Sequence, residues 1–333
     1  MSRHHGTDST RREFLQTTAT ALLWGAAAPL GATALRGAPA TAHVGMARDP
    51  AVLTASGGVL PAGVAALLDR ALAGALGTPT ATAGLARLFG PADTVGIKVN
   101  CLAGRGLSTH LELVEAIIAA LVQVGVRADR IIVWDRTDHD LTRARYRVRR
   151  SGDGPLVFGT NDDYENEPID AGSVGGCLSR ILTRRVTAVV NVPILKDHDL
   201  AGISGALKSF YGAIHNPNKY HDDNCAPFVA DLAAHPMVQG KARLTVFDAL
   251  RPQFQGGPAY VPEYAWPLGA VFASTDPVAA DAVALDLISR KRREVGLESL
   301  EHAGRPARWL PLAAARGLGV ADLARITRTG AWT

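Results

Sequence analysis

The chain has 333 residues, of which 47% are hydrophobic and 20% are charged, so it can bury a large core in one domain or two intimate ones. Its formal net charge is +4, and residues 1–42 hold four arginines against two acidic residues, so the remaining +2 gives no basis for a nucleic-acid partner. Aromatic residues make up only 6% and are scattered, which argues against a base-stacking surface.

The N-terminal stretch has the pattern of an export signal. Arg11 and Arg12 form a twin-arginine pair, an Ala-rich run from 19 to 34 follows, and residues 40–42 fit a small-x-small cleavage site. The run is shorter than the roughly 20 strongly apolar residues of a spanning helix. We therefore predict that residues 1–42 are a signal for the twin-arginine export machinery, that the protein reaches the periplasm or cell surface, and that it has no stable membrane span.

Residues 43–333 alternate strand-like and helix-like segments. An apolar strand from Thr94 to Val99 is followed by an amphipathic helix from Leu111 to Val124 and a strand from Arg130 to Trp134. Strand, helix and strand at this spacing form a βαβ unit, which makes the two strands parallel. We predict an α/β fold with a mixed, largely parallel sheet flanked by helices, and a ligand site at the carboxyl ends of the strands.

Local signals predict several further boundaries. Thr109 with Glu112 three residues later suggests a capping box. Asp276 before a proline predicts the start of a helix that runs to about Arg293. Residues 143–150 alternate like an edge strand with a solvated cationic face, and residues 301–333 suggest one more helical cap.

The three cysteines, Cys101, Cys177 and Cys225, lie far apart and form no C-x-x-C pair. A cluster held by four thiolates is therefore excluded within one chain. One disulfide with a free thiol, and three buried thiols, remain alternatives.

The most informative stretch runs from 191 to 225, because titratable side chains and amides crowd into it. A buried strand from Ala188 to Val192 is followed by Lys196 and His198, and then by a Gly-Ile-Ser-Gly turn. So many polar groups cannot all be buried without partners. We predict that they line a site, although a solvated loop over residues 216–224 is the plainer alternative.

An anion seat is the first chemistry that this stretch suggests. Gly202 and Gly205 allow close approach of the backbone to a ligand. A helix that starts near Ser204 would point its N–H groups at an anion, with Lys208 one turn further on. His198 would then be the proton-transfer group, rather than a histidine satisfied by a neighbouring aspartate.

Metal binding is the second chemistry that this stretch suggests. His215, His221 and Cys225 offer imidazole and thiolate donors of the kind that bind zinc, iron, nickel or copper. Their spacing matches no standard metal motif. Two alternatives therefore stay open: a bound transition metal such as nickel or iron, alone or in a metallo-cofactor, or no metal.

Polar residues also follow two other predicted strands. Asn100 follows the first, and Asp135, Asp138 and His139 follow the second. Because carboxyl ends of parallel strands meet at one edge, we expect these residues to converge with Lys196. The chain has no G-x-S-x-G, H-E-x-x-H, Walker A or strand-linked G-x-G-x-x-G motif, which argues against those enzyme classes.

Five segments carry a family resemblance: IKVNC, IIVWDRTDHDL, VVNVPILKDHDLAGISGALKSFYG, NPNKYH and TDPVAADA. They resemble the bacterial family catalogued as domain of unknown function 362. The likeness covers nearly all of residues 43–333, and it implies the α/β fold but no assigned activity.

A second resemblance concerns the site alone. His198-x3-Gly202-x2-Gly205-x2-Lys208 is similar to the corresponding segment of nickel-pincer lactate racemases. That likeness implies a lysine that carries a nickel cofactor, acid/base histidines at His198 and His139, and a nickel ligand at His215 or His221. The sequence Gly205-Ala206-Leu207-Lys208 lacks one glycine and the arginine that are typical of that family.

We therefore predict an exported enzyme of unassigned activity that acts on a small anionic substrate, of the proton-transfer isomerase or oxidoreductase type. His198 would be the acid/base, and Lys208 the anion clamp or cofactor anchor. The alternative is a non-catalytic metal- or anion-binding protein of the cell envelope, in which the same residues are ligands without a proton relay.

Overall fold

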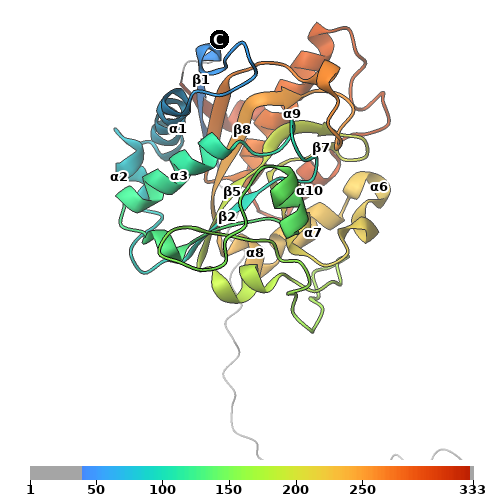
Figure 1. Cartoon of the computed structure of the whole chain (residues 1–333). Helices are drawn as coiled ribbons and strands as arrows, with labels where there is room; N and C mark the ends of the chain where they lie inside the picture. Colours follow the sequence, from blue (N-terminus) through green and yellow to red (C-terminus); the bar gives the residue numbers. More distant parts are fainter. Residues whose placement is uncertain (1–39, 331–333) are drawn as a thin grey trace, which may run out of the picture. The chain divides into compact units, whose positions relative to one another are not determined.

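The structure is a computed structural model that describes residues 40–330, and these residues fall within one compact unit (Figure 1). They contain one ten-stranded sheet, with eight strands in the order β10-β1-β9-β8-β5-β2-β3-β4 and with β6 and β7 branching from β8. The strand bounds are β1 Ala42–Arg48, β2 Val95–Val99, β3 Ile131–Trp134, β4 Leu156–Val157, β5 Ala188–Val192, β6 Ile194–His198, β7 Gly202–Ile203, β8 Ala242–Gln253, β9 Ala270–Ser274 and β10 Ile326–Thr329.

Most neighbouring strands are parallel. The run β8-β5-β2-β3-β4 is parallel throughout, and β1 is parallel to β10, whereas β9 is antiparallel to both of its neighbours. The predicted mixed, largely parallel α/β fold is therefore confirmed.

Helices cover both faces of the sheet. One face packs against α1 Pro61–Leu76, α2 Ala81–Leu85 and α3 Leu111–Gln123, and the other against α5 Ala206–Ser209, α7 Phe228–Ala234, α9 Pro277–Glu294 and α10 Trp309–Ala315 (Figure 1). Shorter helices are α4 Asp138–Arg143, α6 Asp222–Cys225 and α8 Pro236–Gln239, with tight turns at Pro50–Val52, Ala128–Arg130, Ile181–Arg185, Phe210–Ala213, Pro217–Tyr220, Pro262–Tyr264 and Leu323–Arg325.

The pleat of the strands separates the two halves of the core. In β5, Val190 packs with the helices of the first face and Val189 with those of the second. In β8, Val246 and Phe247 divide in the same way. Both faces are buried because alternate side chains of a strand point in opposite directions.

Three local predictions change. His110, not Thr109, is the N-cap of α3, because the Thr109 hydroxyl accepts the N–H of Asn100 and donates to the carbonyl of Val192 instead. Residues 143–150 form the end of α4 and a loop with one bridge at Arg149, since β4 takes the sheet edge. The C-terminal tail contributes α10, as predicted, and also the strand β10 beside β1.

Asp276 is the N-cap of α9, as predicted, and accepts a hydrogen bond from the N–H of Ala279. In the part of the chain that the structure describes, no helix combines the length and apolarity needed to cross a membrane. The twin-arginine pattern and most of the predicted signal lie outside the described residues.

Candidate functional site

A cavity of about 290 Å³ opens at the carboxyl ends of β2, β3 and β6. Three buried lysines line it: Lys98 from β2, Lys196 from β6 and Lys208 from α5. We call it the lysine cavity. This volume lies at the lower end of the range for small-molecule sites in proteins, about 300–1,000 Å³, so the cavity suits a small ligand.

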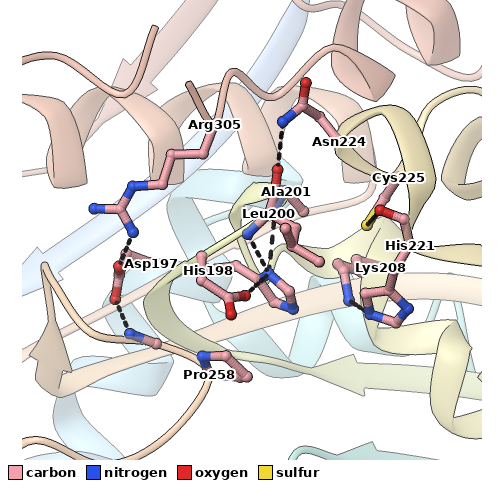
Figure 2. A network of polar contacts seen from close by, with 12 residues as sticks. Asp197, His198, Leu200, Ala201, Lys208, His221, Asn224, Cys225, Pro258 and Arg305 are labelled. Carbon is pink, nitrogen blue, oxygen red and sulfur yellow. Dashed lines mark hydrogen bonds and ion pairs between the residues drawn. The ribbon is translucent and has the colours of Figure 1, made fainter. Parts of the chain in front are cut away.

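Strand β6 presents its side chains alternately to the cavity and to the protein interior. Lys196 and His198 line the cavity. Asp197 between them lies 2.8 Å from Nη1 of Arg305 (Figure 2), and it also accepts the N–H of Gly257. This alternation is the period of an extended strand. The sequence analysis placed these residues directly after the strand Ala188–Val192, and the structure shows that they form a separate strand in a short hairpin with β7.

The tautomer of His198 is set by the hairpin turn that follows it. Its Nδ1 accepts the N–H groups of Leu200 and Ala201, at 3.1 and 3.3 Å (Figure 2). A ring nitrogen that accepts carries no proton, so the proton of a neutral His198 is on Nε2. Burial and then the nearby charge of Lys208 lower the pKa of His198 to about 2.

The carboxylate of Asp199 also lies 2.9 Å from Nδ1 of His198, which would be an ion pair if the ring were protonated. Asp199 is 61% exposed, so water can solvate its charge. Protonation of Nδ1 would leave two backbone N–H groups without their acceptor, which costs more than an ion pair with one exposed carboxylate would gain. His198 is therefore neutral. It is an N–H donor in this site, not the ready base that the sequence suggested.

Lys208 and His221 form a hydrogen-bonded pair on the opposite wall. Nζ of Lys208 lies 3.0 Å from Nε2 of His221 (Figure 2). Nδ1 of His221 lies 3.1 Å from the carbonyl of Pro217. The carbonyl can only accept, so Nδ1–H donates to it and Nε2 is free to accept from the lysine. Burial, followed by the charge of Lys208, lowers the pKa of His221, which keeps the ring neutral.

Burial also lowers the pKa values of two of the three lysines. It lowers the pKa of Lys208 to about 8, although Nζ lies 4.5 Å from the face of the Tyr211 ring, which favours a cation. It lowers the pKa of Lys196 to about 8 as well, and the second cause is repulsion by Lys208. Within residues 40–330, neither lysine has a carboxylate partner in an ion pair. Amines of this kind can exchange protons near neutral pH.

The third lysine is paired. Nζ of Lys98 lies 2.6 Å from Asp135, whose second oxygen accepts the N–H of Cys101 at 2.7 Å. Both carboxylate oxygens of Asp135 therefore already have partners, Lys98 and the N–H of Cys101. The inner part of the lysine cavity therefore holds more positive than negative charge, which favours an anion.

The structure brings together about half of the predicted site residues and separates the others. The lining of the lysine cavity includes Asn100, Asp135, Lys196, His198, Lys208 and His221. Asp138 and His139 do not line it: Asp138 accepts the N–H of Gly159 and pairs with Arg150, and His139 is exposed. Asp140, which the sequence did not single out, lines the cavity in their place.

The two glycines approach other parts of the protein, not a ligand. A Cβ on Gly202 would lie 2.9 Å from the carbonyl of Arg305, and one on Gly205 would lie 2.9 Å from the Trp309 ring. Both have positive φ, which suits glycine.

The predicted anion seat is filled by the protein itself. The carboxylate of Asp281, fully buried on α9, accepts the N–H groups of Ala206 and Leu207 at the start of α5. The N–H groups that the sequence offered to a substrate therefore have a partner. Anion binding in the lysine cavity has to come from side chains.

The three predicted metal donors do not converge. His215 is exposed and packs edge-on against Tyr164, away from the lysine cavity. Cys225 is buried, and burial raises the pKa of its thiol, which disfavours a thiolate. Among residues 40–330, no group of three or more His, Cys, Asp or Glu side chains is placed to hold a metal ion.

The nickel cofactor implied by the racemase likeness also does not fit. Of the proposed nickel ligands, only His221 reaches the lysine cavity, where it already pairs with Lys208. The cavity of about 290 Å³ has room for a small substrate, but not for a substrate beside a large organic cofactor.

Three buried charged residues in or beside the site were not among the predicted site residues. Lys98 had a signal, a lone charge inside the apolar strand VGIKV, and Asp281 had another, a carboxylate among alanines and valines of a helix. Arg305 had none, because its partner Asp197 is 108 residues away.

A family model described as "Domain of unknown function (DUF362)" matches residues 95–286, more than half of the chain. A crystal structure of a protein from Thermotoga maritima, a structural genomics target, is similar with a TM-score of 0.42 and 11% identity over 63% of this chain and 58% of that one. The chain thus spans less than two thirds of that protein, and a likeness this small carries no functional argument. No protein with a curated description matches the chain.

Proposed function

The chain belongs to the family of Domain of unknown function (DUF362), and we propose that it is an enzyme that binds a small carboxylate anion in the lysine cavity and moves a proton on that substrate. The observation that carries this proposal is the contact of 3.0 Å between Nζ of Lys208 and Nε2 of His221. A lysine beside a neutral imidazole, both facing one cavity, is a pair that can give and take a proton.

Anion binding is supported by the uncompensated lysines. Burying an ammonium group without a counter-ion is costly, and Lys196 and Lys208 have none among the described residues. A bound carboxylate would supply the missing negative charge. Oδ1 of Asn100 and Oγ of Ser209 are also buried without a hydrogen-bond partner, and both residues line the lysine cavity. The Ser209 hydroxyl can donate to a carboxylate oxygen, whereas the amide oxygen of Asn100 can only accept and suits a hydroxyl group of the ligand.

The residues divide the work as follows. Lys196 and the Nε2–H of His198 hold the carboxylate, and their hydrogen bonds favour the charge that develops as a neighbouring C–H loses its proton. Lys208 and His221 receive that proton and return it. Each of these steps uses side chains that line the lysine cavity.

Proton exchange in D₂O tests the proposal without knowledge of the product. The full chain is incubated with lactate, malate, pyruvate and 2-oxoglutarate in turn, and loss of the C–H signal beside the carboxylate or carbonyl is followed by NMR. We expect exchange with at least one acid, and a decrease of roughly 10²–10⁴-fold in Lys208→Met. Lys219→Met is the matched control, since Lys219 is exposed in the same stretch.

Two outcomes contradict the enzyme. Binding of these acids without exchange would favour the anion-binding protein instead, and neither binding nor exchange would remove the anion site. Calorimetry on the same acids separates the two.

We also propose export, on the basis of the Arg11-Arg12 pattern. Replacing both arginines by lysine should retain the protein in the cytoplasm of a host with twin-arginine export, as measured by cell fractionation. Unchanged export of that variant would contradict this assignment.

A further inference from the structure

The Lys208–His221 pair has the arrangement of a nucleophile activated by a neighbouring base. Such a site needs a nucleophile, a base within hydrogen-bonding distance and a third group that orients the base. Nζ of Lys208 is the nucleophile, Nε2 of His221 at 3.0 Å is the base, and the carbonyl of Pro217 at 3.1 Å from Nδ1 orients the ring. The His221 ring also stacks on the His198 ring, with ring centroids 5.7 Å apart, and this contact restricts its orientation.

We propose that Lys208 forms an imine with a 2-oxo acid, a small molecule whose carbonyl is next to its carboxylate. This inference rests on the proposed function, since it uses the same anion site and names its substrate class. The carboxylate lies between Lys196 and the Nε2–H of His198, and the carbonyl carbon faces Nζ of Lys208.

The choice of a 2-oxo acid follows from the distribution of charge and space. A cavity of about 290 Å³ lies at the lower end of the range for small-molecule sites, which favours a small acid whose carboxylate and reacting carbon are close together. Lys196 is 1% exposed and donates to the carbonyl of Pro258 at 3.3 Å, which holds its charge at the cavity wall. Lys208 has no such carbonyl partner, and its only polar contact in the described residues is the imidazole.

The step balances without an oxidant or a reductant. The lone pair of Nζ forms a bond to the carbonyl carbon, and one N–H proton passes through Nε2 of His221 to the carbonyl oxygen, which gives a carbinolamine. The oxygen then takes the second N–H proton and leaves as water, while nitrogen and carbon form the C=N bond. The imine makes the neighbouring C–H more acidic, and His221 is positioned to receive that proton.

The burial of Lys208 supports this role. A lysine with a pKa of about 8 has a substantial neutral fraction near pH 7, and only the neutral amine attacks a carbonyl. Cys225, the other nucleophilic side chain nearby, is held as a thiol because burial raises its pKa.

Reductive trapping tests the inference. The full chain is incubated with glyoxylate, pyruvate, 2-oxobutyrate or 2-oxoglutarate and sodium cyanoborohydride, which delivers hydride to a C=N bond, and the modified lysine is located by peptide mass spectrometry. We expect a stable adduct at Lys208 with at least one acid, none at that position in Lys208→Arg, and an unchanged yield in Lys219→Arg. His221→Asn keeps the nucleophile and should slow trapping on the order of 10²-fold.

The failures of this inference and of the proposed function are distinguishable. Proton exchange with these acids but no adduct at Lys208, or equal labelling of Lys219, overturns the imine and leaves the proton-transfer enzyme. Absence of binding, exchange and adduct overturns both. If Lys208→Arg fails to fold, His221→Asn decides, because trapping at the wild-type rate in that variant contradicts the nucleophile–base pair.

Discussion

Oδ2 of Asp197 lies 2.8 Å from Nη1 of Arg305, and both side chains are buried. Asp197 lies between Lys196 and His198 on β6, so this ion pair fixes the cavity-lining strand from its opposite side. Burial raises the pKa of Asp197 even though Gly257 and Arg305 favour its charged form. The pair therefore depends on both partners being present.

Arg305→Leu should remove the countercharge and destabilise the protein by about 3–5 kcal/mol, as expected when one partner of a buried pair is lost. Urea denaturation measures it. Arg308→Leu is the matched control, because Arg308 pairs with Asp223 at an exposed position, 57% and 60% exposed, and such pairs contribute only about 0–1 kcal/mol. Equal effects of the two substitutions would contradict the structural role of Arg305.

Lys196→Met should make the protein more stable at pH 7 and inactive. The folded pKa of Lys196 is about 8, below its ordinary value of 10.5, so burying its charge costs about 3 kcal/mol at about 1.4 kcal/mol for each pH unit. Methionine fills similar space without the charge. A less stable Lys196→Met variant at pH 7 would show that the lysine is compensated.

The same substitution has a pH signature. Between pH 8 and 10.5 the folded protein binds fewer protons at Lys196 than the unfolded chain, so the stability of the wild type rises with pH in that window. The advantage of Lys196→Met should therefore shrink from pH 7 to pH 10. A constant difference across that range would argue against a buried, uncompensated lysine.

Asp281→Ala tests whether this carboxylate holds the start of α5. It should leave the N–H groups of Ala206 and Leu207 without an acceptor, at about 1–3 kcal/mol each. Burial raises the pKa of Asp281 to about 7, so the folded state binds the extra proton between pH 3.8 and 7 and this contribution to stability falls as pH rises. Thermal melts at pH 5 and pH 8 should show a larger loss for Asp281→Ala at pH 5. Asp281→Asn, which keeps one acceptor oxygen, should lose less.

The sheet was predictable because its signals are local. Apolar runs bounded by polar residues identified the strands ending at Val99, Trp134 and Val192, and the βαβ spacing gave their direction. The capping box at Thr109 failed, because the hydroxyl accepts the N–H of Asn100 and donates to Val192 on a neighbouring strand, which no local pattern reveals.

The site was only partly predictable for the same reason. Residues on one strand or one short stretch, such as Lys196, His198 and Lys208, could be grouped from the sequence. The direction of a side chain could not: Asp138 follows β3 but turns toward Gly159 and Arg150. The partner of a helix terminus could not be predicted either, because the acceptor for the N–H groups of α5 is Asp281, on a helix more than 70 residues later.

Lys208 should react with small acylating reagents at lower pH than an ordinary lysine. Its pKa of about 8 means that roughly one amine in ten is neutral at pH 7, against fewer than about one in a thousand at the ordinary value of 10.5. Folded protein treated with trace acetic anhydride between pH 6 and 10, then digested and analysed by mass spectrometry, should show labelling of Lys208 that rises with a midpoint near pH 8. Saturating an acid that binds in the lysine cavity should shift the midpoint upward, since a bound carboxylate favours the ammonium form. In His221→Asn the midpoint should stay below 10.5, because burial rather than the imidazole is the main cause of the lowered pKa. A midpoint near 10.5 in the unliganded wild type would show that Lys208 is solvated, and the lysine cavity would then lack its reactive amine.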